Sequence, residues 1–151
     1  MNLIFNKRNF DIFFAFFGLF IIFIPTVIII FLILFSSGRP IFHFSKRIGK
    51  GDSIFFMPKF RTMKINTPNI ASNKISNPEE YITSIGGVLR KYSLDELPQL
   101  YSILVGKMSF VGPRPALYNQ KKLIELRKKE KINLLMPGLT GWAQINGRDE
   151  I

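Results

Sequence analysis

Two adjacent carboxylates, Asp95 and Glu96, stand in a stretch of the chain that also concentrates cations, prolines and glycines. Cationic side chains precede the pair at Arg90 and follow it at Arg114. Carboxylates bind divalent metal ions and cations bind phosphate oxygens, so these residues suit a metal-bound phosphate if the fold brings them together. Residues 90–115 are therefore the first candidate for a catalytic site.

Three further cations extend this candidate site. Lys59 and Arg61 lie two residues apart, so an extended backbone would put both side chains on one side, where they could hold a diphosphate. The simpler interpretation, which an isolated Lys-Phe-Arg favours, is the solvated face of a strand. Arg148 ends a glycine-rich segment, residues 136–148, whose backbone N–H groups could contact an anion, although glycines alone are weak evidence.

The residues around the acidic pair predict a helix. Ser93 and Glu96 have the spacing of a capping box at the start of a helix that runs toward Val105. Pro98 fits better if this helix begins at Asp95, because the proline then lies within the first turn. In both registers the carboxylates lie at the positive end of a helix, which serves capping and phosphate chemistry alike.

The neighbouring segments would deliver the cations. Residues 81–91 are expected to form a short helix or turn that brings Arg90 beside the acidic pair. Gly106 is placed to end the predicted helix. The prolines on either side of Arg114 fix an extended backbone and hold its guanidinium ready to clamp a phosphate. Residues 116–132 predict a basic helix, either at anionic lipid headgroups or as a solvated surface helix.

Lys59 and Arg61 fall in a predicted β-hairpin. Two β-rich runs between residues 41 and 63 are separated by a turn at residues 49–52. Pro58 makes the second strand an edge strand or ends it. Residues 64–80 have the composition of a surface loop. The single histidine, His43, is interpreted as a strand residue without a catalytic role, because it has no His or Cys companion.

Residues 12–35 are almost wholly apolar and predict a membrane segment. As one continuous helix they would extend roughly 36 Å, enough to cross a bilayer core. Pro25 predicts a bend or break, and basic residues flank both ends of the segment. A re-entrant hairpin would put both flanks on one side of the membrane, and a kinked spanning helix is the alternative. Asp11 is expected to cap this helix or to pair with Arg8 at the headgroup level.

Composition restricts the other kinds of site. The chain has no cysteine, which excludes disulfides and thiolate metal sites, and one histidine does not make a histidine metal cluster. A formal net charge of +11 attracts anionic lipids, nucleic acids and phosphorylated small molecules. A nucleic-acid binder would account for the charge but not for the apolar segment or the acidic pair, so nucleic acid is not an expected partner.

Together these segments resemble the bacterial sugar transferase family, the small monotopic polyprenyl-phosphate hexose-1-phosphate (phosphoglycosyl) transferases. The resemblance covers nearly the whole chain and implies an α+β fold. It places a proline-kinked, re-entrant membrane helix in residues 1–38 and a small, mainly helical cytoplasmic catalytic domain with a short β-hairpin in residues 39–151. The motifs that carry it are Lys7-Arg8 with Asp11, the proline-broken apolar run, G-R-P-I-F, R-I-G, K-F-R-T-M, L-R-K-Y-S-L-D-E-L-P-Q-L, V-G-P-R-P and P-G-L-T-G-W-A-Q-I-N-G-R.

The resemblance also implies an activity and residue roles. Such an enzyme transfers a sugar 1-phosphate from a nucleotide diphosphate sugar, usually a UDP-sugar, to polyprenyl (undecaprenyl) phosphate, which initiates a lipid-linked glycan. Asp95 would be the nucleophile, and Glu96 would hold Mg²⁺. The protein would work at the bacterial cytoplasmic membrane with its catalytic domain facing the cytoplasm. The phosphate-binding residues would be Lys59, Arg61, Arg90, Arg114 and Arg148.

Two departures from the family pattern bear on these expectations. Ile24 stands where a serine commonly precedes the helix-breaking proline. The family usually continues beyond the position of Ile151 with a further segment, so the C-terminal part of the domain is expected to be missing. The alternative function is therefore a truncated, catalytically inactive membrane-anchored protein that binds anionic lipid or nucleotide sugar.

Overall fold

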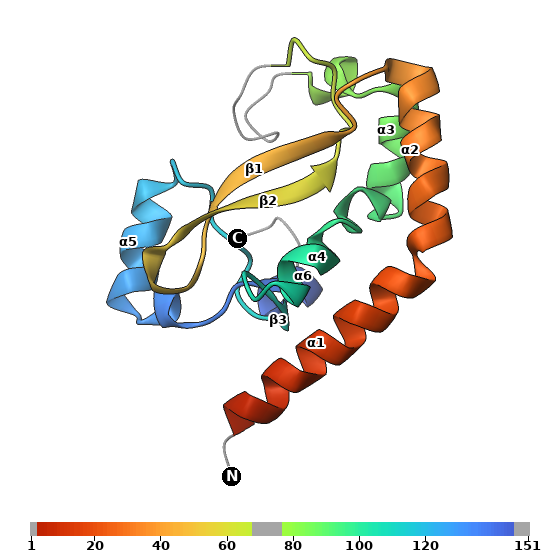
Figure 1. Cartoon of the computed structure of the whole chain (residues 1–151). Coiled ribbons are helices and arrows are strands. Elements are labelled where there is room, and N and C mark those ends of the chain that lie inside the picture. The colour runs from red at the N-terminus through yellow and green to blue at the C-terminus, as the bar shows by residue number, and fades with distance from the viewer. Residues whose placement is uncertain (1–2, 68–76, 147–151) are drawn as a thin grey trace. The chain divides into compact units, whose positions relative to one another are not determined.

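The computed structural model of the chain describes residues 3–67 and 77–146, which combine helices with two small sheets (Figure 1). This mixture confirms the predicted α+β class. The chain divides into two compact units, and each is built from separate stretches of sequence. The first unit comprises Met1–Ile21, Phe44–Pro58 and Gln99–Ile151, and the second comprises Ile22–His43 and Lys59–Pro98.

The apolar segment forms two consecutive helices, α1 (Leu3–Ile21) and α2 (Phe23–Ser37). Neither helix alone has the length and apolar character to cross a bilayer, whereas the consecutive pair does by length and composition. The interruption at Ile22 lies three residues ahead of Pro25, so the proline falls in the first turn of α2, where its missing N–H is tolerated. The Ile22 carbonyl accepts the Thr26 N–H at 2.8 Å. The path of this segment through a membrane stays a prediction.

The predicted hairpin is confirmed by β1 (Phe42–Ile48) and β2 (Ile54–Phe60), which pair in a two-stranded sheet. A short 3₁₀ turn, η1 (Lys50–Asp52), connects them, and Gly51 and Asp52 both have left-handed backbone angles there. His43 lies in β1, as predicted. Pro58 does not end β2, which continues through it to Phe60 because a two-stranded sheet leaves each strand a free edge.

In the first unit a second sheet pairs two short parallel strands, β3 (Ser109–Val111) and β4 (Gly138–Thr140). The backbones approach so closely that a Cβ at Gly138 would overlap the Gly112 nitrogen. The N–H groups of Gly112 and Gly138 donate to the carbonyls of Thr140 and Pro113, at 2.9 and 3.0 Å. The expectation that this glycine-rich segment offers N–H groups to an anion is therefore wrong for Gly138.

The other helices of the first unit are shorter than predicted. α4 (Gln99–Leu104) ends two residues before Gly106, whose positive φ of 81° confirms it as the terminator. The basic helix expected over residues 116–132 is α5 (Lys121–Lys129), followed by η5 (Ile132–Leu134). The chain ahead of α5 is held in a bridge between Arg47 and Leu117. A last helical turn, α6, spans Trp142–Ile145.

The N-terminal part of α1 is anchored to α4 and β3 through its charged residues. Arg8 donates to the carbonyls of Ile103 and Leu104 at 2.6 and 2.7 Å and so caps the C-terminal end of α4. Asp11, only 4% exposed, accepts the Phe110 N–H at 3.1 Å. The expected roles of Asp11 are wrong, because α1 begins at Leu3 and leaves Asp11 in the helix interior, and because its partner is backbone.

The second unit packs α2 against α3 (Ser84–Lys91) and the end of β2. Its core consists of Ile29, Ile33, Phe60 and Leu89. Thr83 caps α3, since its hydroxyl accepts the Gly86 N–H at 3.1 Å. The helix predicted near residues 81–91 is thus confirmed, and it carries Arg90 in its last turn. Two 3₁₀ turns flank α3, η3 (Pro78–Tyr81) and η4 (Leu94–Glu96).

Candidate active site

The second unit brings the acidic pair together with Lys59. Asp95 and Glu96 lie in η4, and Lys59 is near the end of β2. The Lys59 ammonium contacts Glu96 Oε1 at 2.5 Å and Asp95 Oδ2 at 3.9 Å. These side chains are mostly buried, so their ionic interactions are screened less than those at an open surface. Residues far apart in sequence thus form one charged cluster.

The backbone that carries the acids differs from the predicted helix start. Ser93 adopts a left-handed conformation, with φ 55°, and its side chain makes no capping hydrogen bond. The chain then makes the three-residue turn η4, and α4 begins only after Pro98. The capping-box interpretation is therefore wrong, because an N-cap residue needs an extended backbone that the turn at Ser93 does not provide.

The environment of Asp95 raises the pKa of its carboxyl above the ordinary value, chiefly through burial. The neighbouring Glu96 carboxylate also raises this pKa, whereas the charges of Lys59 and Arg90 lower it. Asp95 is 8% exposed. The cations therefore offset part of the cost of a buried carboxylate, which is the form that can attack phosphorus.

Arg90 reaches this cluster from the last turn of α3. Its Nε donates to the Thr62 hydroxyl at 2.8 Å, and its charge acts on Asp95. Thr62 follows directly after Arg61 and is buried. The structure thus brings together four residues predicted for the site, Lys59, Arg90, Asp95 and Glu96, and it adds Thr62, which the sequence did not single out.

Arg61 is held in a different way from its neighbour Lys59. Its guanidinium is buried and donates to the backbone carbonyls that end α2: Ser37 at 2.6 Å, Gly38 at 2.7 Å and Arg39 at 3.0 Å. This is a cationic cap at a helix C-terminus. The geometry gives Arg61 a structural role, and its predicted phosphate contact stays a prediction.

Arg114 belongs to the first unit, where its side chain is exposed while its backbone is fixed. The Arg114 carbonyl accepts from Arg127 Nη1 at 2.7 Å, and the next carbonyl, that of Pro115, accepts from Arg47 Nη1 at 3.0 Å. The stiff loop predicted from the flanking prolines is thus held by two further arginines. Arg148 lies outside the described residues.

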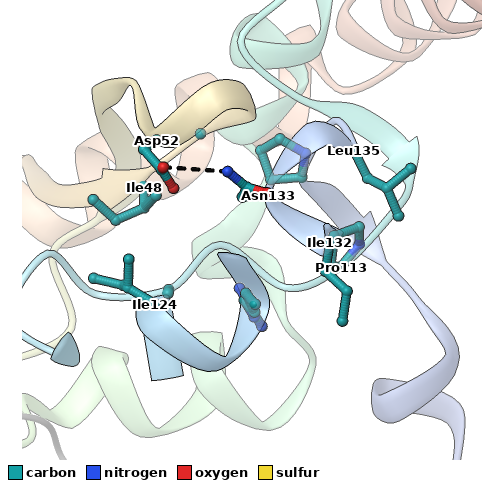
Figure 2. A pocket seen from close by; sticks show the side chains of 11 residues that line it. Ile48, Asp52, Pro113, Ile124, Ile132, Asn133 and Leu135 are labelled. Carbon is teal, nitrogen blue, oxygen red and sulfur yellow. Dashed lines mark hydrogen bonds between the residues drawn. The ribbon is translucent and has the colours of Figure 1, made fainter. Parts of the chain in front are cut away.

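A pocket in the first unit lies beside this loop (Figure 2). Figure 2 shows Asn133 reaching Asp52, and this hydrogen bond from Nδ2 to Oδ2 is 3.2 Å long. Arg127 lines this pocket and donates to the Arg114 carbonyl. Burial lowers the pKa of the Arg127 guanidinium. None of the described residues predicted for the site lines the pocket, which is formed by Ile48, Gly49, Asp52, Pro113, Ala116, Ile124, Arg127, Ile132, Asn133, Leu135 and Pro137.

The acidic pair suits one way of binding Mg²⁺. Among residues 3–67 and 77–146, no three Asp, Glu or His side chains gather into a metal site built from protein alone. Mg²⁺ is commonly held by one or two carboxylates together with substrate phosphates and water. Glu96 already holds a cation, the Lys59 ammonium, at 2.5 Å. The donor set therefore fits a metal ion that arrives with a phosphate substrate.

Comparison with known proteins identifies the family. The model of the family described as "Bacterial sugar transferase" matches residues 2–151. The chain belongs to this family. It is 37% identical to the exopolysaccharide production protein ExoY of Sinorhizobium fredii, over 97% of this chain and 71% of ExoY.

Two longer relatives have names that state an activity. The chain is 41% identical to the UDP-glucose:undecaprenyl-phosphate glucose-1-phosphate transferase of Xanthomonas campestris, over 74% of this chain and 24% of that protein. It is 40% identical to the Escherichia coli protein of the same name, over 74% of this chain and 25% of that protein. The sequence motifs therefore identified the family correctly.

Proposed function

We propose that this protein transfers a sugar 1-phosphate from a nucleotide diphosphate sugar to polyprenyl phosphate. The observation that carries the proposal is the cluster of Asp95 and Glu96 with Lys59 and Arg90 in one unit. Membership of the bacterial sugar transferase family supports it, and so do the names of the Xanthomonas and Escherichia relatives, which specify UDP-glucose and undecaprenyl phosphate. A UDP-sugar is accordingly the proposed donor.

The proposed reaction has two displacements at one phosphorus. An Asp95 carboxylate oxygen attacks the phosphorus that bears the sugar, the bond to the nucleotide phosphate breaks, and a nucleoside monophosphate leaves. An oxygen of polyprenyl phosphate then attacks the same phosphorus and releases Asp95, which yields a polyprenyl diphosphate sugar. Lys59 and Arg90 reduce the repulsion between the attacking oxygen and the phosphate oxygens in both steps, where the attacking oxygen belongs first to Asp95 and then to polyprenyl phosphate.

Glu96 is the residue proposed to hold Mg²⁺, for which its carboxylate and the neighbouring Asp95 provide oxygen ligands. A bound Mg²⁺ supplies Lewis-acid stabilisation of charge on the phosphate oxygens. In this proposal Lys59 shares Glu96 with the metal ion, and Arg90 remains beside Asp95.

A membrane location with both ends of the apolar segment on one side is also part of the proposal. At the N-terminal end, Arg8 and Asp11 are bound by the backbone of residues 103–110, and at the C-terminal end Arg61 binds residues 37–39. Among the described residues, α1 with α2 is the only candidate span. Residues 103–110 follow the apolar segment in the chain, and no other candidate span lies among the described residues. Their contacts with Arg8 and Asp11 therefore support a re-entrant segment and a cytoplasmic catalytic site.

Sugar phosphate transfer is testable with the full chain in lipid nanodiscs. The assay supplies UDP-glucose or UDP-N-acetylgalactosamine, undecaprenyl phosphate and Mg²⁺, and it measures release of uridine monophosphate and formation of lipid-linked sugar. We expect both products in equal amounts from at least one donor. Release of free sugar phosphate without lipid-linked product would contradict the acceptor, and absence of nucleotide release from every UDP-sugar supplied would contradict the proposed function.

A further inference from the structure

Thr62 contacts the candidate site through Arg90. Its hydroxyl accepts the Arg90 Nε–H at 2.8 Å, and the residue is 6% exposed. We propose that Thr62 is a positioning residue that holds the Arg90 guanidinium beside Asp95 for phosphate binding. The inference rests on the proposed function, because it is the transfer reaction that requires a guanidinium there.

The backbone of Thr62 is held firmly enough to serve this role. Its carbonyl accepts the Thr83 N–H at 3.0 Å. The residue before it, Arg61, donates its N–H to the Ile41 carbonyl at 2.8 Å, and Lys64 donates to Tyr81 at 2.8 Å. The hydroxyl is therefore presented from a backbone that is bound on both sides.

The face of α3 that meets Thr62 also carries Arg90. Gly86 and Arg90 are four residues apart and share one side of the helix. Gly86 lies so close that a Cβ would overlap the Thr62 carbonyl oxygen. The start of α3 is thus packed against the carbonyl of Thr62. One helical turn later, the hydroxyl of Thr62 binds Arg90.

This hydrogen bond leaves the useful part of the guanidinium free for other partners. It engages Nε, whereas the two Nη groups form the fork that binds phosphate oxygens in bidentate fashion. An arginine side chain has many rotamers, so a fixed Nε restricts where that fork lies. A displacement of about 1 Å in a positioning group costs up to about a hundredfold in rate.

The same contact has a simpler explanation, in which Thr62 contributes only to the stability of a buried hydroxyl network. Thr83 offers the matched control, because its hydroxyl lies in the same network but binds the Gly86 N–H and the Thr62 carbonyl rather than Arg90. Thr83→Val should therefore lose stability without displacing the guanidinium. Thr62→Ser keeps the hydroxyl and should restore what Thr62→Val removes.

The test combines transfer kinetics with NMR of the arginine Nε–H groups of the full chain in nanodiscs, where Arg90→Lys identifies the Arg90 signal. For Thr62→Val and Thr62→Ala we expect a moved Arg90 signal and a loss in kcat/KM of about tenfold or more, with Thr62→Ser within about threefold of wild type. Thr83→Val should leave the signal in place. Thermal melting shows which variants are folded, and either Thr62→Val or Thr62→Ala decides the test if it is folded.

Two results would overturn the inference. The first is a wild-type kcat/KM in the folded Thr62→Val and Thr62→Ala variants. The second is a loss of kcat/KM in Thr83→Val as large as that in the Thr62 variants, with the Arg90 signal unmoved in all of these variants. If the wild-type chain transfers no sugar phosphate, the proposed function fails by itself. The NMR signal then still decides whether Thr62 holds Arg90, since an unmoved signal in Thr62→Val contradicts the positioning role without any assay of activity.

Discussion

Asp95 combines burial with proximity to two cations, and this combination makes it the best candidate for the nucleophile. Replacement by Asn keeps the shape and removes the attacking charge. We expect Asp95→Asn to lower nucleotide release and lipid-linked product by more than about 10³-fold. The matched control is Asp52→Asn, which removes a carboxylate at a left-handed position that asparagine tolerates. Wild-type transfer by Asp95→Asn would contradict the assignment.

The raised pKa of Asp95 predicts how activity depends on pH. Burial favours the protonated carboxyl, and only the ionised form attacks phosphorus. As pH falls, kcat/KM should therefore decline at a higher pH than an exposed carboxyl would give. The measurement is the acidic limb of the pH profile. An acidic limb at or below the ordinary carboxyl range would show that Asp95 is not the group that titrates.

The stability of the folded protein should also depend on the ionisation of Asp95, but in the opposite direction from activity: rising pH should increase activity and decrease stability. Because the folded-state pKa lies above the unfolded one, the folded chain holds the proton more tightly. Ionisation of Asp95 therefore costs stability as pH rises from the unfolded pKa to the folded one. Relative to Asp95→Asn, the wild type should lose melting temperature across that window. A difference in melting temperature between the two proteins that stays constant at all pH values would contradict this prediction.

At the scale of elements, Arg61 caps the C-terminal end of α2. Its removal should lower the stability of the protein more than it lowers the rate of transfer. Its buried guanidinium donates to the carbonyl of Ser37, the last residue of α2, and to the next two carbonyls, those of Gly38 and Arg39. Arg61→Met should lower the free energy of unfolding by about 3 kcal/mol, measured by chemical unfolding in nanodiscs or micelles. Lys64→Met, which removes an exposed cation and leaves these carbonyls untouched, serves as the control. An unchanged stability with a raised KM would instead favour the phosphate-binding role predicted from sequence.

Adjacent glycines in α3 provide a second test of how this unit is packed. A Cβ at Gly86 would overlap the Thr62 carbonyl oxygen, whereas one at Gly87 would meet only an Ile82 methyl at 3.9 Å. Gly86→Ala should therefore destabilise the protein and impair transfer. Gly87→Ala should stabilise it by roughly 0.5–1 kcal/mol, since alanine is the better helix former. Equal melting temperatures for the two variants would contradict the close approach of α3 to Thr62.

The elements also show which parts of the structure are readable from sequence. The hairpin and α3 were predicted because strand pattern, turn residues and helix limits lie within short windows. The pairing of β3 with β4 was missed, because each strand has only three residues and the contact is between segments far apart in the chain. The hydrogen bond between Thr62 and Arg90 was missed for the same reason, since an isolated threonine carries no local signal of its long-range partner. The sequence predicts the same role for Arg61 and Lys59, whereas in the structure Arg61 binds backbone carbonyls and Lys59 binds Glu96.

At the scale of the whole molecule, the net charge of +11 and the apolar pair α1 and α2 agree with attachment to an anionic membrane. The apolar run of residues 12–35 predicts that association by its composition alone. The same composition does not distinguish a spanning segment from a re-entrant one, because both need an apolar run of this length. The distinction depends on contacts at the two ends, which only a folded structure supplies.

Those contacts lead to a prediction about membrane sidedness. Since the chain has no cysteine, single-cysteine variants give an unambiguous label. Asn9→Cys and Ser53→Cys lie beyond the two ends of the apolar run, at exposed positions. In sealed, oriented membrane vesicles, both should react with an impermeant maleimide from the cytoplasmic side alone. Ile24→Cys, at a position 68% exposed in the protein, should resist the reagent from either side because lipid covers it. Reaction of Asn9→Cys and Ser53→Cys from opposite sides would establish a spanning segment. The contacts of Arg8 and Asp11 with residues 103–110 could not then form, because residues 103–110 follow the apolar segment in the chain.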